Sequence, residues 1–296
     1  MTFIAGPAVV TVPATSANLG PGFDSLGLAL ELRDALRGAV IPRGLVVEVS
    51  GEGEADVPRD EAHLVVRTMR ATFERLGVSA PGLELVCTNS IPHARGLGSS
   101  AAAIVGGVLL ARALVGGGAE ALPDHAAFRL AAELEGHPDN VAAALYGGLT
   151  VSGREAHGFF ATRVPVSSSI RTVAFVPPTP LSTEVARGLL PETVPHAEAA
   201  ANSGRTALLV AALAGQPDLL LTATEDYLHQ SHRRPAMPVS LDLVDRLRGD
   251  GHAAVVSGAG PTVLVLVADD ADLAPYTPER WEHRVLDVAT DGARTA

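Results

Sequence analysis

The sequence contains no lysine, since all 22 of its basic residues are arginine. A Walker-A phosphate loop, a protein-kinase site and a Schiff-base enzyme each need a lysine side chain, so these chemistries are excluded. The 33 acidic residues give a formal net charge of −11 and a pI near 5.3. Because nucleic-acid binders usually carry a basic stripe, this balance predicts no nucleic-acid partner.

Cysteine and long apolar runs are scarce as well. The one cysteine, Cys87, cannot form an internal disulfide, so no oxidising compartment is indicated. The first residues lack the basic and apolar segments of a signal peptide. The most apolar stretches, 101–111 and 208–215, are well short of the ~20 residues that span a bilayer. We therefore expect a cytoplasmic protein without a membrane partner.

The chain does have ample material for a core, since 47% of its 296 residues are hydrophobic and 19% are charged. This length suffices for two modest domains. Predicted helices and strands alternate without the strict rhythm of a doubly wound parallel sheet, which favours the α+β class. The composition changes near Pro165, so we expect one domain over residues 1–165 and a second over 166–296.

Hydrophobic periodicity and turn residues predict the individual elements. Strands are expected at 8–13, 44–50, 83–87, 148–152, 172–176 and on both sides of a turn within 253–267. Helices are expected at 60–76, 99–114, 124–134, 140–146, 182–190, 197–214 and 241–248. Glycine and proline predict a loop over 16–25.

The most informative segment is Pro92-His-Ala-Arg-Gly-Leu-Gly-Ser-Ser-Ala, residues 92–101. Its glycines let backbone N–H groups turn inward, and Ser99 and Ser100 begin a helix whose first N–H groups are unpaired. Such a helix start suits a phosphate, and the serine hydroxyls suit Mg²⁺. A plain glycine turn in which serine only caps the helix explains the same residues.

Two further segments carry polar residues at unusual density. One is Ser257-Gly-Ala-Gly-Pro-Thr, which on its own predicts a hairpin turn. It would contribute backbone N–H groups to a phosphate site only if it lay beside the loop 92–101. In the segment 133–141, Glu135, His137, Asp139 and Asn140 could supply a metal ligand and substrate contacts, or Asp139 and Asn140 could simply cap the next helix.

Isolated polar residues carry weaker signals. Asn18 and Asp24 lie six positions apart in the predicted loop, and Arg187 and Arg233 are candidates to bind a carboxylate with both arms of the guanidinium. Several histidines show no metal-ligand spacing and are expected on the surface or in the core: 125, 157, 196, 229, 232, 252 and 283.

Taken together, the segments resemble the GHMP kinase superfamily, and within it the branch that acts on homoserine. The matching motifs are Val12-Pro-Ala-Thr-Ser-Ala-Asn-Leu-Gly-Pro-Gly-Phe-Asp-Ser-Leu-Gly, the loop 91–102, Glu135-Gly-His-Pro-Asp-Asn-Val-Ala and Val256-Ser-Gly-Ala-Gly-Pro-Thr. They follow the family order over nearly the whole chain. The loop 91–102 is common to the superfamily, whereas the first and third motifs are typical of the homoserine branch.

The resemblance implies an ATP-dependent transfer of phosphate to the side-chain hydroxyl of L-homoserine, giving O-phospho-L-homoserine for threonine synthesis. It also implies a ribosomal-protein-S5-like N-terminal domain, a ferredoxin-like C-terminal domain, a homodimer, and ATP and Mg²⁺ as cofactors. A GHMP kinase for another small amino-acid-like alcohol and a non-catalytic nucleotide-binding relative stay open as alternatives.

The resemblance also assigns roles to individual residues. The ATP-binding residues would be Pro92, Arg95, Gly96, Leu97, Gly98, Ser99, Ser100, Ala101, Ser257, Gly258, Ala259 and Gly260. Homoserine would be bound by Asn18, Asp24, His137, Asn140, Arg187 and Arg233, with Asp24 at its ammonium group and the two arginines at its carboxylate. The catalytic set would be Asn18, Ser100, Glu135, Asn140 and Thr183, with Thr183 near the reacting hydroxyl.

Some details of this assignment are specific to the chain. Ser100 and Glu135 would hold Mg²⁺, with Glu133 as the alternative carboxylate. Asn140 stands where mevalonate-type relatives have an aspartate base, so we expect the hydroxyl to attack without a dedicated strong base. His63 replaces an asparagine near the adenine pocket, and His93 stands where arginine is frequent.

Overall fold

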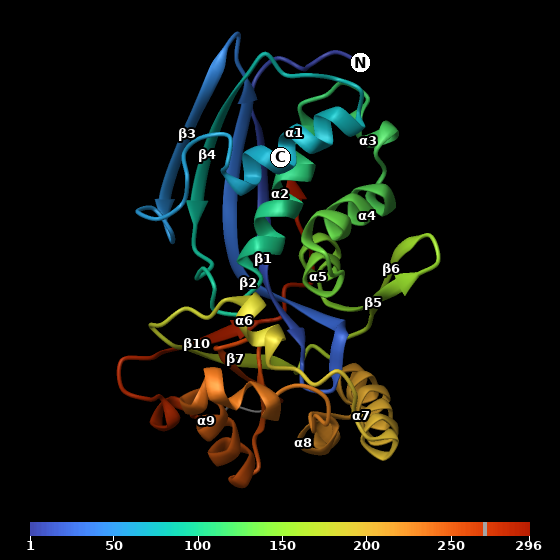
Figure 1. Cartoon of the computed structure of the whole chain (residues 1–296), viewed down its shortest axis with the longest axis vertical. Coiled ribbons are helices and arrows are strands. Elements are labelled where there is room, and N and C mark those ends of the chain that lie inside the picture. Colours follow the sequence, from blue (N-terminus) through green and yellow to red (C-terminus); the bar gives the residue numbers. More distant parts are fainter. Residues whose placement is uncertain (269–270) are drawn as a thin grey trace.

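The computed structural model describes residues 1–268 and 271–296, which form two sheets with helices packed on them (Figure 1). The first sheet has seven strands in the order β11-β1-β2-β4-β3, with β5 pairing β2 and β6 pairing β5. Its strands are β1 (Ala8–Asn18), β2 (Gly22–Val40), β3 (Gly44–Gly51), β4 (Gly82–Asn89), β5 (Leu149–Glu155), β6 (Gly158–Val164) and β11 (Arg294–Thr295).

Helices of the N-terminal half gather on one side of this sheet (Figure 1). They are α1 (Leu64–Arg75), α2 (Ser99–Ala113), α3 (Gly118–Ala121), α4 (Asp124–Glu135) and α5 (Asp139–Tyr146). Helix α2 is the central one, because it contacts α1, α4, α5 and strand β1. It is rich in alanine and glycine and almost wholly buried, which lets its neighbours approach closely.

The second sheet is antiparallel with the order β10-β7-β9-β8, the order of a ferredoxin-like sheet. Its strands are β7 (Arg171–Val176), β8 (Ala253–Val256), β9 (Val263–Val267) and β10 (Glu282–Asp287). Its helices are α6 (Thr183–Gly188), α7 (His196–Gly215), α8 (Leu220–Ala223) and α9 (Pro238–Gly249), with 3₁₀ turns η1 (Pro217–Leu219), η2 (Ser231–Ala236) and η3 (Ala274–Tyr276).

Strands β8 and β9 join the two halves through their alternating side chains. Val255 and Leu264 belong to the large core of the N-terminal half, whereas Val256 and Val263 pack in a smaller core with α9. Because successive strand residues point to opposite faces, an unbroken apolar run covers both faces of the sheet. The two halves therefore share a continuous interior, and the N-terminal end of α2 lies at their junction.

The expected helices and strands are all present, with ends shifted by a few residues. The loop expected over 16–25 is wrong, because β1 continues to Asn18 and pairs it with Gly22 at the start of β2. Only a tight turn of Leu19, Gly20 and Pro21 remains, and Asn18, Leu19 and Asp24 all have positive φ. The sequence also did not predict β2, β6, β10, β11, α3 or α8.

Two other expectations concern the organisation of the chain. The domain boundary at residue 165 stays a prediction: β1–β6 precede it and β7–β10 follow it, but β11 returns to pair with β1. Within the described ranges, no helix has both the length and the apolar character needed to cross a membrane.

Close contact between β2 and α5 predicts a sharp difference between two glycine substitutions. In Gly27→Ala, the new Cβ would collide with the backbone oxygen of Asp139, which cannot move aside like a flexible side chain. We expect a loss of about 1–3 kcal/mol in the free energy of unfolding, measured by denaturant titration. Gly204→Ala in α7, where a Cβ meets no atom within 4 Å, should instead add about 0.5–1 kcal/mol. Equal stability of both variants would contradict this packing.

Candidate functional site

A cavity of about 240 Å³ lies at the junction of the two halves. Most residues predicted from the sequence line it: Asn18, Gly96, Gly98, Ser99, Ser100, Glu135, His137, Asn140, Thr183, Arg187, Arg233, Gly258 and Ala259. The structure therefore brings together segments that are far apart in the chain. The predicted residues that do not line the cavity are Asp24, Pro92, Arg95, Leu97, Ala101, Ser257 and Gly260.

The start of α2 presents bare backbone to this cavity. Gly98 is the N-cap residue, with φ of 72° in the left-handed region, and no side chain caps the helix in the described structure. A Cβ at this position would collide with Oγ1 of Thr15, so glycine is required both for its conformation and for space. The free N–H groups and the positive end of the helix dipole form a site suited to an anion.

The second glycine loop packs directly on the first. The loop joins β8 to β9 as a hairpin, and the Ser257 hydroxyl lies 2.7 Å from the carbonyl oxygen of Gly96. Thr262 N–H donates to the carbonyl of Arg95 at 3.2 Å, and Gly258 N–H donates to that of Ala17 at 3.0 Å. The segment is thus a hairpin turn and at the same time one wall of the cavity. Ser257 is fully buried and does not line the cavity, so its hydroxyl serves to hold the two glycine loops together.

A serine–carboxylate pair lies beside the helix start. Ser100 Oγ donates to Glu135 Oε2 at 2.7 Å. Burial raises the pKa of Glu135, while the bond from Ser100 opposes that rise. These are hard oxygen ligands of the kind that Mg²⁺ prefers. Glu133, the alternative carboxylate, is exposed and lines a separate groove.

The segment that links α4 to α5 places three polar side chains around the same cavity. Asp139 Oδ1 accepts the Asn140 backbone N–H at 2.7 Å and lies 3.7 Å from His137 Nδ1. Complete burial raises the pKa of Asp139 to about 6. Asn140 Oδ1 accepts the hydroxyl of Thr15 at 2.8 Å, which leaves the amide N–H₂ group available to a ligand. Asn140 is therefore oriented as a hydrogen-bond donor.

Asp24 and Arg187, which the resemblance places at opposite ends of the substrate, are paired with each other. Two Arg187 nitrogens lie 2.6 and 3.3 Å from the two carboxylate oxygens. Both Arg187 and Arg233 line the cavity, and the Nε atom of each is buried without a hydrogen-bond partner among the described residues. Because buried donors are nearly always paired, these two N–H groups are suited to an acidic ligand or an ordered water.

A second cavity, of about 290 Å³, lies on the other side of the α2 start. Ser99 and Ser100 line both cavities, and the rest of the second lining is largely apolar, with Val57, Leu64 and Ala103 among its residues. The two histidines singled out in the sequence, His63 and His93, lie here. Burial lowers the pKa of His63, and the charge of His93 adds to this effect.

Some residues of the first cavity were not included in the predicted site set. Asp139 carried a signal, because it stands between His137 and Asn140 in one polar segment. Ala17, Ala94, Leu181 and Ser182 also line the cavity, but no sequence pattern distinguishes them from ordinary loop residues.

Asp139→Asn should stabilise the protein at neutral pH. Its ordinary carboxyl pKa of 3.8 applies in the unfolded chain, whereas burial raises the folded-state pKa to about 6. Stability is therefore lost as the pH rises between these values, and the full cost of ionisation is present above about pH 6. The amide keeps the acceptor for the Asn140 N–H without any charge. By calorimetry, we expect the variant to melt several degrees above the wild type at about pH 8 and at the same temperature at about pH 4. Identical melting curves at both values would show that ionisation of Asp139 costs nothing.

Comparisons with known proteins identify relatives of this chain. Family models match the chain at residues 63–148 (GHMP kinases N terminal domain) and 208–275 (GHMP kinases C terminal). A homoserine kinase of Streptomyces coelicolor is 58% identical over 276 residues, which are 91% of this chain and 89% of the relative. A homoserine kinase of Streptomyces avermitilis is 54% identical over 299 residues, with 98% of each chain covered.

The fold is shared with solved structures. A crystal structure of homoserine kinase from Cytophaga hutchinsonii is similar with a TM-score of 0.85 and 25% identity, over 100% of this chain and 99% of that one. The expected two-domain α+β fold of GHMP kinases is thereby confirmed. With likeness of this extent in both sequence and structure, the chain belongs to the GHMP kinase superfamily and, within it, to the homoserine kinase family.

Proposed function

We propose that the protein transfers the γ-phosphoryl group of ATP to the side-chain hydroxyl of L-homoserine. The observation that carries this proposal is the position of the α2 start, whose uncapped N–H groups separate an apolar cavity from a charged one. An adenosine group fits the chemistry of the apolar cavity, and an amino acid fits that of the charged cavity. The triphosphate would then cross Ser99 and Ser100, which line both cavities.

The magnesium site would be completed by the nucleotide. Ser100 and Glu135 offer one hydroxyl and one carboxylate, and phosphate oxygens and water would fill the remaining positions, as is usual for Mg²⁺. Within the described residues, no group of three or more histidine, cysteine or acidic side chains could hold a metal alone. When bound, the ion would neutralise charge on the phosphate oxygens. The exposure of Glu133 favours Glu135 as the ligand.

Homoserine would be bound at both of its charged ends. Arg187 and Arg233 offer unpaired guanidinium N–H groups to a carboxylate, and Asp24 offers a carboxylate to an ammonium group. The zwitterion would take its place between Asp24 and Arg187, exchanging their direct ion pair for one with each end of the substrate. Thr183 and Asn18, which also line the cavity, would border the substrate.

Catalysis would depend on alignment and charge more than on proton abstraction. Phosphoryl transfer passes through a loose transition state, which needs positioned groups and stabilised charge. Asn140 faces the cavity as a donor because its oxygen already accepts the Thr15 hydroxyl. It therefore cannot act as a strong base and would orient the substrate hydroxyl or a phosphate oxygen. A homodimer and a cytoplasmic location stay predictions from the sequence.

An assay of ADP release with several acceptors tests this function. With ATP and Mg²⁺, we expect turnover with L-homoserine and background rates with L-serine, L-threonine and mevalonate. The distance from Arg187 and Arg233 to the α2 start is fixed by the fold, so a shorter amino acid would leave its hydroxyl out of line with the phosphate. Faster turnover with another amino-acid-like alcohol would favour the alternative acceptor. No turnover with any acceptor would favour a non-catalytic nucleotide-binding protein.

Two glutamine variants provide a matched control for the metal assignment. Glu135→Gln should lower kcat by roughly 100-fold or more, because it removes the carboxylate beside Ser100. Glu133→Gln should retain the wild-type rate, since that side chain is exposed outside the cavity. The reverse pattern would assign the magnesium to Glu133.

A further inference from the structure

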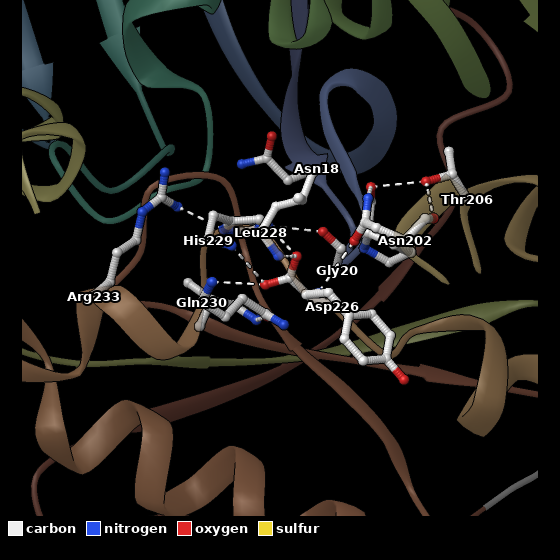
Figure 2. Close-up of polar contacts among 12 residues, drawn as sticks. Asn18, Gly20, Asn202, Thr206, Asp226, Leu228, His229, Gln230 and Arg233 are labelled. Carbon is white, nitrogen blue, oxygen red and sulfur yellow. Dashed lines mark hydrogen bonds and ion pairs between the residues drawn. The ribbon is translucent and has the colours of Figure 1, made fainter. Parts of the chain in front are cut away.

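Arg233 is held in place by hydrogen bonds to His229, which does not line the cavity, and to Gly258, and Figure 2 shows the arrangement around His229. The arginine is only 1% exposed. Its Nη1 donates one hydrogen to His229 Nδ1 at 3.1 Å and the other to the carbonyl oxygen of Gly258 at 2.9 Å. The remaining N–H groups, on Nε and Nη2, make no hydrogen bond to any described residue. One arm of the guanidinium is thus anchored, and the other edge is left for a ligand.

The surroundings of His229 fix which of its nitrogens carries the proton. Nε2 lies 2.7 Å from the carbonyl oxygen of Gly20 and 3.7 Å from Asp226 Oδ1, and both of these atoms are acceptors. Nε2 must therefore bear the hydrogen, and Nδ1 is left as an acceptor for Arg233. Burial lowers the pKa of His229 to about 4, against the opposing effect of Asp226 and with a smaller contribution from Arg233, so the ring is neutral at physiological pH.

Asp226 organises the backbone that carries this histidine. Its carboxylate accepts the backbone N–H groups of Leu228 at 2.9 Å, His229 at 3.1 Å and Gln230 at 2.7 Å (Figure 2). The Gln230 side chain in turn accepts the N–H of Val256, immediately before the second glycine loop. The turn is therefore fixed to the sheet as well as to itself.

His229 links Arg233 to the turn between β1 and β2. Its partner Gly20 lies in the tight turn between β1 and β2, and Asn18, at the start of that turn, donates to the same Gly258 carbonyl as Arg233 does, at 2.9 Å. These contacts close a ring from Asn18 through Gly258, Arg233 and His229 back to Gly20. The ring sets the distance between the arginine and the turn that carries Asn18 and Asp24.

We propose that His229 is a positioning residue for the substrate carboxylate, because it anchors one arm of Arg233 and ties it to the β1–β2 turn. This role rests on the proposed function, in which Arg233 binds the carboxylate of L-homoserine. His229 does not line the cavity, so it acts only through Arg233 and Gly20. A neutral imidazole suits this task, since it accepts a hydrogen bond from the guanidinium without repelling its charge.

Two variants that each keep one half of the imidazole test the proposal. His229→Asn places an amide oxygen near the Nδ1 position and keeps the acceptor for Arg233. His229→Gln places an amide N–H near the Nε2 position and keeps the bond to Gly20. We expect H229Q to raise the KM for L-homoserine about tenfold with an unchanged KM for ATP, and H229N to raise it much less. His252→Gln, whose imidazole packs edge-on against the Tyr276 ring and does not line the cavity, is the matched control and should behave as the wild type.

A double-mutant cycle identifies the route of the effect. In an Arg233→Ala background, H229Q should cause no further rise in the KM for L-homoserine, because the group it positions is gone. The inhibition constant of 3-aminopropan-1-ol, which lacks the carboxylate, should be the same for H229Q and the wild type. Additive effects, or equal losses with both ligands, would give His229 a general structural role and overturn the proposal.

Nitrogen-15 NMR of the wild-type protein tests the geometry without any variant or turnover. The His229 ring should hold its proton on Nε2 from about pH 5.5 to about pH 8.5, and its Nδ1 signal should shift when L-homoserine is added. The charged groups facing this ring are Asp226, Arg233 and Asp24. A ring protonated on Nδ1 would overturn the proposal.

If the wild type shows no turnover of L-homoserine, the proposed function fails. An active wild type whose KM is unaffected in H229Q overturns only the positioning role.

Discussion

The structure depends on a helix that begins without a cap. Helix α2 starts at a glycine in the left-handed conformation, pressed against Thr15, and its first N–H groups have no side-chain partner. These N–H groups belong to residues that line both cavities, so they are available to an anionic ligand. The surrounding fold keeps the site open: the β8–β9 loop supports the glycine loop from behind, and the two cavities meet at Ser99 and Ser100.

Charge is arranged around this helix start without lysine. The charged cavity is lined by the buried Arg233, the partly exposed Arg187 and the carboxyl groups of Glu135 and Asp139. Arg187 also forms an ion pair with Asp24, which does not line the cavity. Burial shifts the pKa of Asp139 upward, to about 6, and that of Arg233 downward, to about 10, so burial opposes the charged form of both groups. A zwitterionic substrate with a nearby polyphosphate would bring charges of both signs to this lining.

Local motifs predicted much of the cavity lining, because many of those residues lie in short segments with their own conformational logic. The glycine-rich turn before Ser99 and the polar segment from Glu135 to Asn140 could be identified from residue types and spacing. Hydrogen bonds and ion pairs between residues far apart in the chain could not be identified in this way. The Thr15–Asn140 hydrogen bond, which makes Asn140 a donor, joins residues 125 apart in the chain, and the Asp24–Arg187 pair joins residues 163 apart. His229 had no metal-ligand spacing and was expected only in the core or on the surface. Its role depends on Gly20, which the fold brings to it.

A crystal structure of the protein with Mg²⁺ and a non-hydrolysable ATP analogue would test the central claim most directly. The account predicts that the β- and γ-phosphates accept hydrogen bonds from the N–H groups of Ser99 and Ser100, with the adenine in the cavity beside His63 and His93. Phosphates bound away from the α2 start, with those N–H groups still uncapped, would contradict it.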